Sequence, residues 1–347
     1  MSDAPESRPN ELALIDSWCD FKSHNENRAE RTVTSYRQAL VRLGRYLAEQ
    51  GETLIAATPE RLEDFSGRHL HQLKIIPNSR RVSVAAIRGF YGWLSRKNVI
   101  EENPARSLPA PRAGRPLPRA MSMSQAERLL LEPGLKTFKG VRDTAILAIL
   151  IGAGCRASGI VNLDQEDLIW TQSAAGTERL IVRLTEKGKK QRLVPVPLET
   201  SLLVRAYLGH PDLDKIDRTL LDGNLVLFPT TVNNFVPAHL YFGEARRMKS
   251  WTIDRLVKAY GKRAKLPPAL CHAHALRHLY GTELAEHDVD LLVRQALMGH
   301  ASPATTEIYT HLAMRKLIAT VDKASPISRM SGGPAFALAN KIRLHRA

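Results

Sequence analysis

Five prolines between residues 103 and 119 divide the chain into two parts, because neither a helix nor a central strand tolerates such a segment. The prolines alternate with four arginines, and the apolar periodicity of the flanking sequence is absent here. This composition is typical of an extended, semi-rigid segment, so we predict a basic linker over residues 103–119. The chain has 347 residues, which is long enough for each part to bury its own core.

The part before the linker has helical periodicity throughout. Thr32 is predicted to start one helix and Gly51 to end it. Pro59 opens another helix, and Ser79 begins a further one. The apolar stripe of that last helix is predicted to hold Val82, Ala86, Phe90 and Trp93. We therefore predict a compact four-helix N-terminal domain over residues 1–102, with arginines on its outer surface.

The part after the linker begins as helix and then changes to strand. Ser124 starts a capping box, which marks the beginning of a helix. The apolar run at residues 144–155 predicts a buried core helix. Two β-rich runs follow, at residues 179–185 and 191–197, and the basic residues between them are typical of a hairpin loop.

Helical periodicity returns after the hairpin. Residues 250–263 predict a basic amphipathic helix and residues 313–323 a last helix, whereas residues 230–247 fit no regular element. We predict a mainly α fold with a small antiparallel β-sheet. The second domain is expected over residues 120–325, followed by a flexible basic tail over residues 326–347.

The formal net charge of +15 is unevenly distributed. Residues 1–30 hold three basic and seven acidic side chains, whereas residues 31–120 hold 16 basic and seven acidic ones. A long basic surface suits a protein that grips a polyanion, although a well-solvated surface would give the same count. No uncharged apolar run approaches the ~20 residues of a membrane span, and three cysteines without paired spacing fit a reducing compartment. We expect a cytoplasmic protein with no membrane partner.

Residues able to act on a phosphate gather between positions 274 and 309. His274 and Arg277 are three residues apart and therefore project from one helix face, and His300 and Tyr309 follow. Two imidazoles, a guanidinium and a phenol suit one task, which is to hold a phosphate while a hydroxyl attacks it. No acidic cluster accompanies them, so we expect neither a metal nor a cofactor. The alternative is ordinary packing, with the histidines and the tyrosine as parts of the core.

Five motifs occur in an order that resembles the tyrosine recombinase (phage integrase) family, in its Xer and transposon-integrase branch. They are Gly154-Cys155-Arg156-Ala157-Ser158, Lys187 in the hairpin loop, His274-Ala275-Leu276-Arg277-His278, Met298-Gly299-His300 and Ile308-Tyr309-Thr310. One such motif is weak by itself, but five in order are specific. The resemblance covers residues 11–325 and implies a helical core-binding domain followed by a mixed α/β catalytic domain.

The resemblance implies a catalytic set of Arg156, Lys187, His274, Arg277, His300 and Tyr309. The two arginines would hold the non-bridging oxygens of a phosphodiester, because a guanidinium is a permanently charged, two-pronged donor. The tyrosine would attack phosphorus to give a 3′-phosphotyrosyl link, with His274 as its base and His300 bonded to the phosphate or the phenol. Lys187 would protonate the departing 5′-oxygen.

The family also implies the partners. These are double-stranded DNA with an inverted-repeat core site, a homotetramer on synapsed sites, and accessory proteins in some systems, all in the bacterial cytoplasm at the nucleoid. We assign DNA binding to Arg37, Arg80, Arg81, Arg88, Arg112, Arg115, Lys189 and Lys190. The linker arginines also fit a plain spacer, and the loop lysines also fit solvated charge.

One position departs from the family pattern. The family usually has an acid three residues after the first arginine, where it supports a catalytic histidine, and this chain has Gly159. Either Asp164 substitutes for that acid or activity is reduced. The expected function is site-specific recombination in the integration, excision or resolution of a mobile element or replicon. The alternatives are relaxation like that of a type IB topoisomerase and a catalytically weakened DNA-binding protein.

Overall fold

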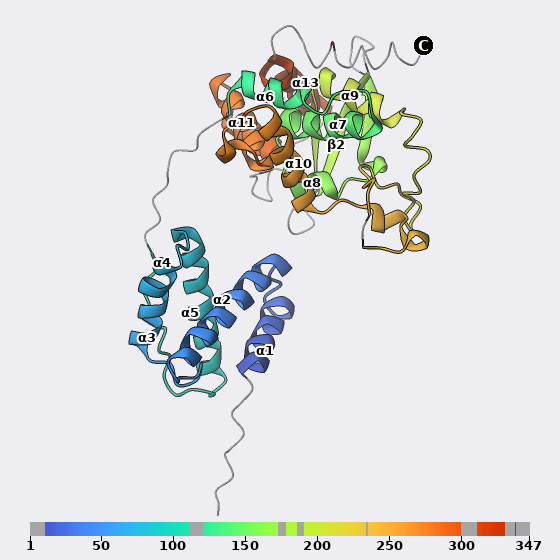
Figure 1. Ribbon diagram of the computed structural model, residues 1–347. Helices are drawn as coiled ribbons and strands as arrows, with labels where there is room; N and C mark the ends of the chain where they lie inside the picture. The colour runs from blue at the N-terminus through green and yellow to red at the C-terminus, as the bar shows by residue number, and fades with distance from the viewer. Residues whose placement is uncertain are drawn as a thin grey trace, which may run out of the picture. The chain divides into compact units, whose positions relative to one another are not determined.

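The computed structural model describes residues 11–111, 121–172, 178–185, 191–233, 235–299, 311–329 and 337, with backbone alone at residues 311–316 and 329. The chain separates into two compact units, Met1–Leu117 and Pro118–Ala347, which Figure 1 colours from blue to red along the chain. The predicted fold, mainly helical with a small antiparallel sheet, is confirmed. In the parts that the structure describes, no helix is long and apolar enough to cross a membrane.

The regular elements of unit 1, in its described part, are all helices. Its elements are α1 (Glu11–His24), α2 (Glu30–Glu49), α3 (Pro59–Asp64), the π-helical turn η1 (Phe65–His69), α4 (Leu70–Gln72) and α5 (Pro77–Arg96). The helix α2 packs against α1 and α5. Trp18, Phe90 and Tyr91 are fully buried at the centre, and the rings of Trp18 and Phe90 meet edge to face at 5.8 Å. These aromatic residues hold the helices together.

Two of the three predicted helix starts in unit 1 are displaced, whereas the start at Pro59 is confirmed. Helix α2 begins at Glu30 rather than at Thr32. Helix α5 begins at Pro77 rather than at Ser79, because proline is pre-organised for the first helical position. With this start, Val82 is 41% exposed and does not belong to the buried stripe.

The first residues of the predicted linker pack against unit 1. Ala105 and Leu108 are buried in its core. Arg88 Nε donates a hydrogen bond to the carbonyl oxygen of Leu108 at 2.9 Å. Residues 103–108 are therefore fixed to the helical unit, although their proline content predicted an extended segment.

Unit 2 is built around α7 (Phe138–Ala153), which is buried along almost its whole length, as its apolar sequence predicted. It packs against α9 (Leu198–Leu208) and α11 (Ala273–Glu286). The other α-helices are α6 (Met123–Leu131), α8 (Ala157–Val161), α10 (Ser250–Arg263), α12 (Leu291–Met298) and α13 (His311–Ala324). The predicted bounds of α10 agree with the structure, and those of α13 agree within two residues.

The capping box of α6 begins two residues earlier than predicted. Ser122, and not Ser124, accepts a hydrogen bond from the backbone N–H of Gln125 at 3.3 Å. Gln125 Oε1 in turn accepts from the backbone N–H of Ser122 at 2.9 Å. Met121, just before the cap, and Ala126 are both buried, so core packing selects this start.

The sheet has three antiparallel strands in the order β1 (Leu168–Gln172), β2 (Glu178–Thr185) and β3 (Gln191–Pro195). Thr185 pairs with Gln191, so residues 186–190 connect the two ends of a hairpin, as predicted. Strand β2 contacts α8 and α9, and β3 contacts α13. These contacts fix the hairpin to the helical core.

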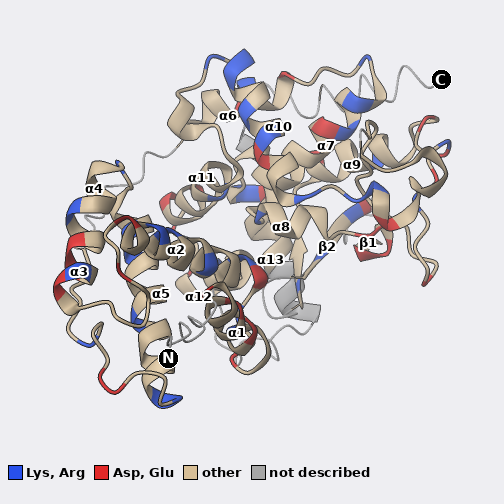
Figure 2. Ribbon diagram, turned by 60° about the horizontal axis from the view of Figure 1, so that its bottom comes forward, with Lys and Arg blue, Asp and Glu red and all other residues tan. Residues whose placement is uncertain are grey.

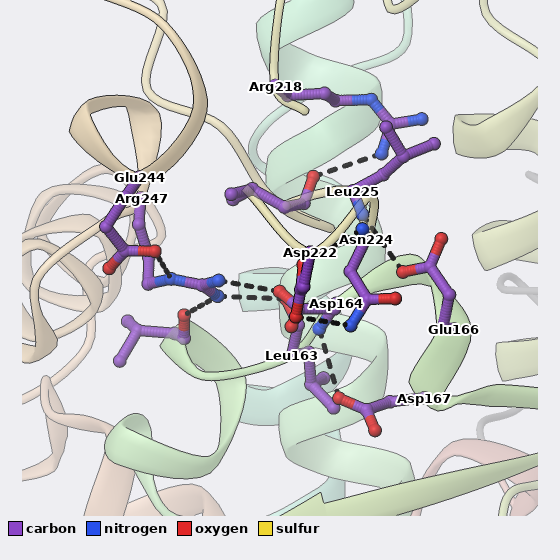
Figure 3. Close-up of polar contacts among 12 residues, drawn as sticks. Leu163, Asp164, Glu166, Asp167, Arg218, Asp222, Asn224, Leu225, Glu244 and Arg247 are labelled. Carbon is purple, nitrogen blue, oxygen red and sulfur yellow. Dashed lines mark hydrogen bonds and ion pairs between the residues drawn. The ribbon is translucent and has the colours of Figure 1, made fainter. Parts of the chain in front are cut away.

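Residues 209–249 form a long irregular segment with two short 3₁₀ turns, η3 (Ala238–Leu240) and η4 (Gly243–Arg246). Figure 3 shows that side chains tie it to the residues before β1. Arg247 Nη2 lies 2.6 Å from Asp164 Oδ1, and Arg218 Nη2 donates to Gln165 Oε1 at 2.6 Å. The segment therefore has fixed ends although it lacks regular structure.

Packing continues beyond residue 325, where the flexible tail was predicted to start. Ser325 and Ile327 are buried, and Ser325 Oγ donates to the carbonyl oxygen of Gly152 at 3.3 Å. Residues up to Ser328 therefore pack with unit 2.

Candidate active site

The end of α7 places Arg156. Gly154 ends this helix in the left-handed conformation, with a φ of 57°, and a Cβ atom there would lie 2.3 Å from Cδ1 of Tyr280. Only glycine therefore fits the turn. Two residues later, Arg156 is the N-cap residue of α8 and is partly exposed. The turn thus presents a guanidinium directly after a buried helix.

Arg277 connects three elements from its position on α11. Its side chain is buried, with 3% exposure. Nη1 donates to the carbonyl oxygen of Gly154 at 2.8 Å, and Nη2 donates to that of Met298. Gly154 lies at the end of α7 and Met298 at the end of α12, so the guanidinium fixes both ends relative to α11.

His274 lies one turn before Arg277 on the same helix. Its ring contacts that of His278 in a T-shaped pair, with centroids 4.5 Å apart. Partial desolvation lowers the pKa of His274, and the charges of His278, Arg277, His272 and Arg156 lower it further. The imidazole is therefore neutral at pH 7 and able to accept a proton. Because Arg277 binds the carbonyl oxygen of Gly154, the start of α11 lies beside the turn that carries Arg156.

The first turn of α11 is anchored by two side chains. Nδ1 of His272 accepts from the backbone N–H of Ala275 at 3.1 Å, and its Nε2 lies 3.0 Å from the carbonyl oxygen of Ala269. Asp254 Oδ1 accepts from the backbone N–H of Ala273 at 3.2 Å. Both contacts fix the helix that carries His274. No group of three or more His, Cys, Asp or Glu residues suited to a metal ion occurs among the described residues.

The end of α12 leads to the position of His300. The helix ends at Gly299, which has a φ of 68°. Arg192 on β3 donates from Nη1 to the carbonyl oxygen of Leu297, so two arginines bind the last carbonyls of α12. Arg192 is not in the predicted site. Its place in the basic run after the hairpin loop is the one signal that could have identified it.

Several predicted site residues lie outside the described part of the chain. They are Lys187, His300 and Tyr309 of the catalytic set, and Arg112, Arg115, Lys189 and Lys190 of the DNA-binding set. The described neighbours of the catalytic residues are the paired strand ends Thr185 and Gln191, Gly299, and His311 at the start of α13. The roles of these residues stay predictions.

The four described DNA-binding candidates lie on two helices of unit 1, Arg37 on α2 and the others on α5. Arg37 Nε forms an ion pair with Asp16 at 2.7 Å. Arg80 Nη1 donates to the carbonyl oxygen of Gly67 at 3.5 Å, whereas Arg88 holds Leu108. Arg81 is exposed. Arg37 and Arg88 are also exposed, whereas Arg80 is half-buried, and the role of all four in DNA binding stays a prediction.

Gly159 lies in α8 with room beside it. A Cβ atom at this position would have ordinary contacts, at 3.6 Å from Cδ2 of Leu184 and 3.7 Å from Cβ of Cys155. The hypothesis that Asp164 replaces the missing acid is not supported, because its carboxylate is engaged by Arg247 in the network of Figure 3. Asp164 therefore has a structural role.

Replacing Gly154 with alanine is expected to destabilise unit 2 by about 2–5 kcal/mol. The left-handed conformation costs an alanine about 1–2 kcal/mol, and overlap with Tyr280 adds roughly 1–3 kcal/mol. Chemical denaturation measures the change. Gly159→Ala is the matched control, since the site is helical and a Cβ atom there would have only ordinary contacts, and it should change stability by less than about 1 kcal/mol. Equal stability of the Gly154→Ala variant and the wild type would contradict the described turn.

Two family models match the sequence. The model of the phage integrase family matches residues 119–316, a range that holds all six predicted catalytic positions, and the phage integrase N-terminal SAM-like domain matches residues 15–98. The chain is 32% identical over 314 residues to tyrosine recombinase XerD of Xanthomonas axonopodis pv. citri (strain 306), over 89% of this chain and 96% of that protein. It is 30% identical over 304 residues to XerD of Yersinia pestis, over 88% and 94% of the two chains.

The fold is also shared with solved structures. The crystal structure of the XerH site-specific recombinase bound to palindromic difH substrate has a TM-score of 0.63 at 17% identity, covering 93% of this chain and 91% of that one. The Tn1549 transposon integrase in complex with circular intermediate DNA has a TM-score of 0.57 at 17% identity, covering 87% and 98%.

Proposed function

The chain belongs to the phage integrase family of tyrosine recombinases, and from this membership we propose that it exchanges DNA strands through a covalent bond to Tyr309. It is a DNA strand transferase that performs site-specific recombination. We further propose that the reaction serves integration, excision or resolution of a mobile element or replicon.

The observation that carries the residue assignment is the cluster of Arg156, His274 and Arg277. These side chains come from segments more than a hundred residues apart, and Arg277 binds the carbonyl oxygen of the turn that leads to Arg156. A buried arginine with fixed geometry is preorganised, so it loses little free energy when it binds charge that develops on a phosphate. This arrangement supports a phosphate site at the junction of α7, α8 and α11.

In the proposed reaction the number of ester bonds to phosphorus stays the same, because one forms as another breaks. The phenol oxygen of Tyr309 attacks phosphorus, its proton passes to the neutral His274, and the bond from phosphorus to the 5′-oxygen breaks. Lys187 gives a proton to that oxygen, and Arg156 and Arg277 bind the non-bridging oxygens. His300 donates to the phosphate or the phenol. Attack on the phosphotyrosine by a second 5′-hydroxyl reverses these steps and joins the new strand.

We also propose the assembly in which this reaction takes place. The DNA is a duplex with an inverted-repeat core site, and four copies of the chain act on two synapsed sites, with accessory proteins where the system requires them. The relatives support the DNA partner, because the Tn1549 integrase is in complex with circular intermediate DNA and XerH is bound to its difH substrate. The proposed location is the bacterial cytoplasm, at the nucleoid.

A nicked substrate tests the covalent step and the role of Lys187. The wild-type chain should form an adduct that survives denaturation, because the short strand beyond the nick diffuses away before it can rejoin. Replacing Lys187 with alanine should slow cleavage by about 10²–10⁴-fold, since the 5′-oxygen then leaves without a proton. Gel quantification of the adduct over time measures both rates.

A substrate with a sulfur leaving group distinguishes the loss of proton donation by Lys187 from other defects of the variant. A substrate with sulfur in place of the bridging 5′-oxygen needs no proton on departure, so the Lys187→Ala variant should cleave it nearly as fast as the wild type does. Failure of that rescue would reject Lys187 as the general acid. No adduct from the wild type at saturating DNA would reject the covalent mechanism and favour a DNA-binding protein weakened at Gly159.

A further inference from the structure

Arg192 on β3 binds the end of a helix that comes much later in the chain. Its Nη1 donates to the carbonyl oxygen of Leu297, next to the last residue of α12. Arg277 donates to the following carbonyl oxygen, that of Met298. We propose that Arg192 is a positioning residue for the recombination reaction, because it keeps Arg277 in place through the end of α12. This inference rests on the proposed binding of phosphate by Arg277.

The two arginines complete the hydrogen bonds at the end of α12. The last four carbonyl oxygens of a helix have no partner within the helix. At α12 the backbone N–H of Gly299 serves those of Gln295 and Ala296, the second at 3.2 Å. The carbonyl oxygens of Leu297 and Met298 accept from the two arginines. All four are therefore bonded, and two of them depend on side chains from other elements.

Helix α12 has no positive charge of its own at this end. Its last turn contains no basic residue, and its single arginine, Arg294, lies earlier in the helix, where Figure 2 would colour it blue. Cations stabilise the negative end of a helix dipole. At α12 these cations come from β3 and α11, and they bind adjacent carbonyl oxygens. A shift of α12 away from β3 would therefore also move the carbonyl oxygen that Arg277 binds.

The alternation of β3 turns Arg192 towards the core. Side chains two residues apart on a strand share a face, and Val194 is fully buried whereas Leu193 is exposed. Arg192 is paired with Leu184 of β2, which is also fully buried. The guanidinium therefore reaches α12 from the buried face of the sheet, and Leu297 at the contact is 1% exposed.

A small displacement of Arg277 is expected to slow the reaction. Its side chain is buried, and its two Nη atoms bind carbonyl oxygens at the ends of α7 and α12. Without Arg192, the end of α12 loses one of its two arginine bonds and becomes less fixed. Misplacement of a catalytic group by ~1 Å can lower a rate by about 10²-fold. Arg192 thus acts on the reaction without contacting the phosphate.

A double-variant cycle tests the inference. With the full chain and the nicked duplex, Arg192→Gln should slow single-turnover cleavage by about 10–100-fold. In the Arg277→Ala background, the same change should slow cleavage by less than about threefold, because the group that Arg192 positions is absent. Gel quantification of the adduct over time measures the four rates. Denaturation curves identify a temperature at which every variant is folded.

Two further variants provide controls. Arg183→Gln removes the same charge from the opposite face of the sheet, since Arg183 is paired with Leu193, and it should cleave at the wild-type rate. Arg192→Lys keeps a charged donor for the carbonyl oxygen of Leu297, so it should regain most of the lost rate. Gel-shift affinity for the duplex should be unchanged in both Arg192 variants, because this residue does not bind the phosphate.

Four outcomes would overturn the inference. An equal loss in both backgrounds would show that Arg192 acts independently of Arg277. Normal cleavage by Arg192→Gln would show that its bond to Leu297 matters only for stability. Recovery of Arg192→Gln on the sulfur substrate would place its effect on the leaving group. A wild-type chain that forms no adduct would reject the proposed function and this inference with it, whereas the other three outcomes reject the inference alone.

Discussion

The Tyr309→Phe variant is expected to bind DNA as tightly as the wild type and to form no covalent adduct. The substitution removes one oxygen, which is the proposed nucleophile, and leaves the aromatic ring. Cleavage should therefore fall by roughly 10⁴-fold or more. The measurement is the denaturation-resistant adduct on a nicked duplex, together with a gel-shift titration of the same protein.

A second tyrosine provides the control. Tyr241 lies in the irregular segment, where its hydroxyl is within 3.1 Å of the carbonyl oxygen of Thr230, and Tyr241→Phe should form the adduct at the normal rate. An adduct of normal yield from Tyr309→Phe would show that another residue attacks the phosphate, and the assignment of this motif would be wrong.

The Arg277→Ala variant should lose both stability and activity. It leaves the carbonyl oxygens of Gly154 and Met298 without their donor, which costs about 2–4 kcal/mol of unfolding free energy. It also removes the proposed phosphate ligand, so cleavage should fall by about 10²–10³-fold even at temperatures where the protein is folded. Arg277→Lys keeps the charge but not the two-pronged donor, so it should regain part of the stability and little of the activity.

The Arg218→Ala variant separates the loss of stability from the loss of activity. Arg218 is also buried, with 7% exposure, and donates to the carbonyl oxygen of Val226 at 3.1 Å and to Gln165. Arg218→Ala should destabilise unit 2 to a similar extent, while the adduct forms at the wild-type rate per folded molecule. Denaturation curves and single-turnover cleavage measure these effects. Wild-type cleavage by Arg277→Lys would reject a bidentate role for this guanidinium.

Where local signals decide the structure, the sequence was sufficient. Helix α10 was predicted with its observed bounds because residues 250–263 alternate apolar and basic positions at helical spacing. The hairpin followed from two β-rich runs with a short polar connection. The apolar run before Arg156 predicted α7, since a helix that is hydrophobic on all sides can only be a core helix.

Where tertiary contacts determine the structure, the sequence was not sufficient to predict it. Ser122 and Ser124 both begin a capping-box pattern, and the burial of Met121 selects the first. Asp164 was one acid among several near Gly159 until the structure showed its ion pair with Arg247. The predicted catalytic role of Arg277 came from a motif, but its bonds to two helix ends depend on residues distant in sequence.

The long irregular segment at residues 209–249 can accept inserted residues. Arg218 and Arg247 fix this segment to the residues before β1, so an exposed part of the chain between them can lengthen without moving α10 or the strands. Doubling the length of a loop costs only about 0.6 kcal/mol in closure entropy. Leu221 and Phe235 are exposed points on this segment. An affinity tag, a fluorophore or a second DNA-reading module could be inserted there. The segment is therefore a site for insertions, both in evolution and in protein engineering.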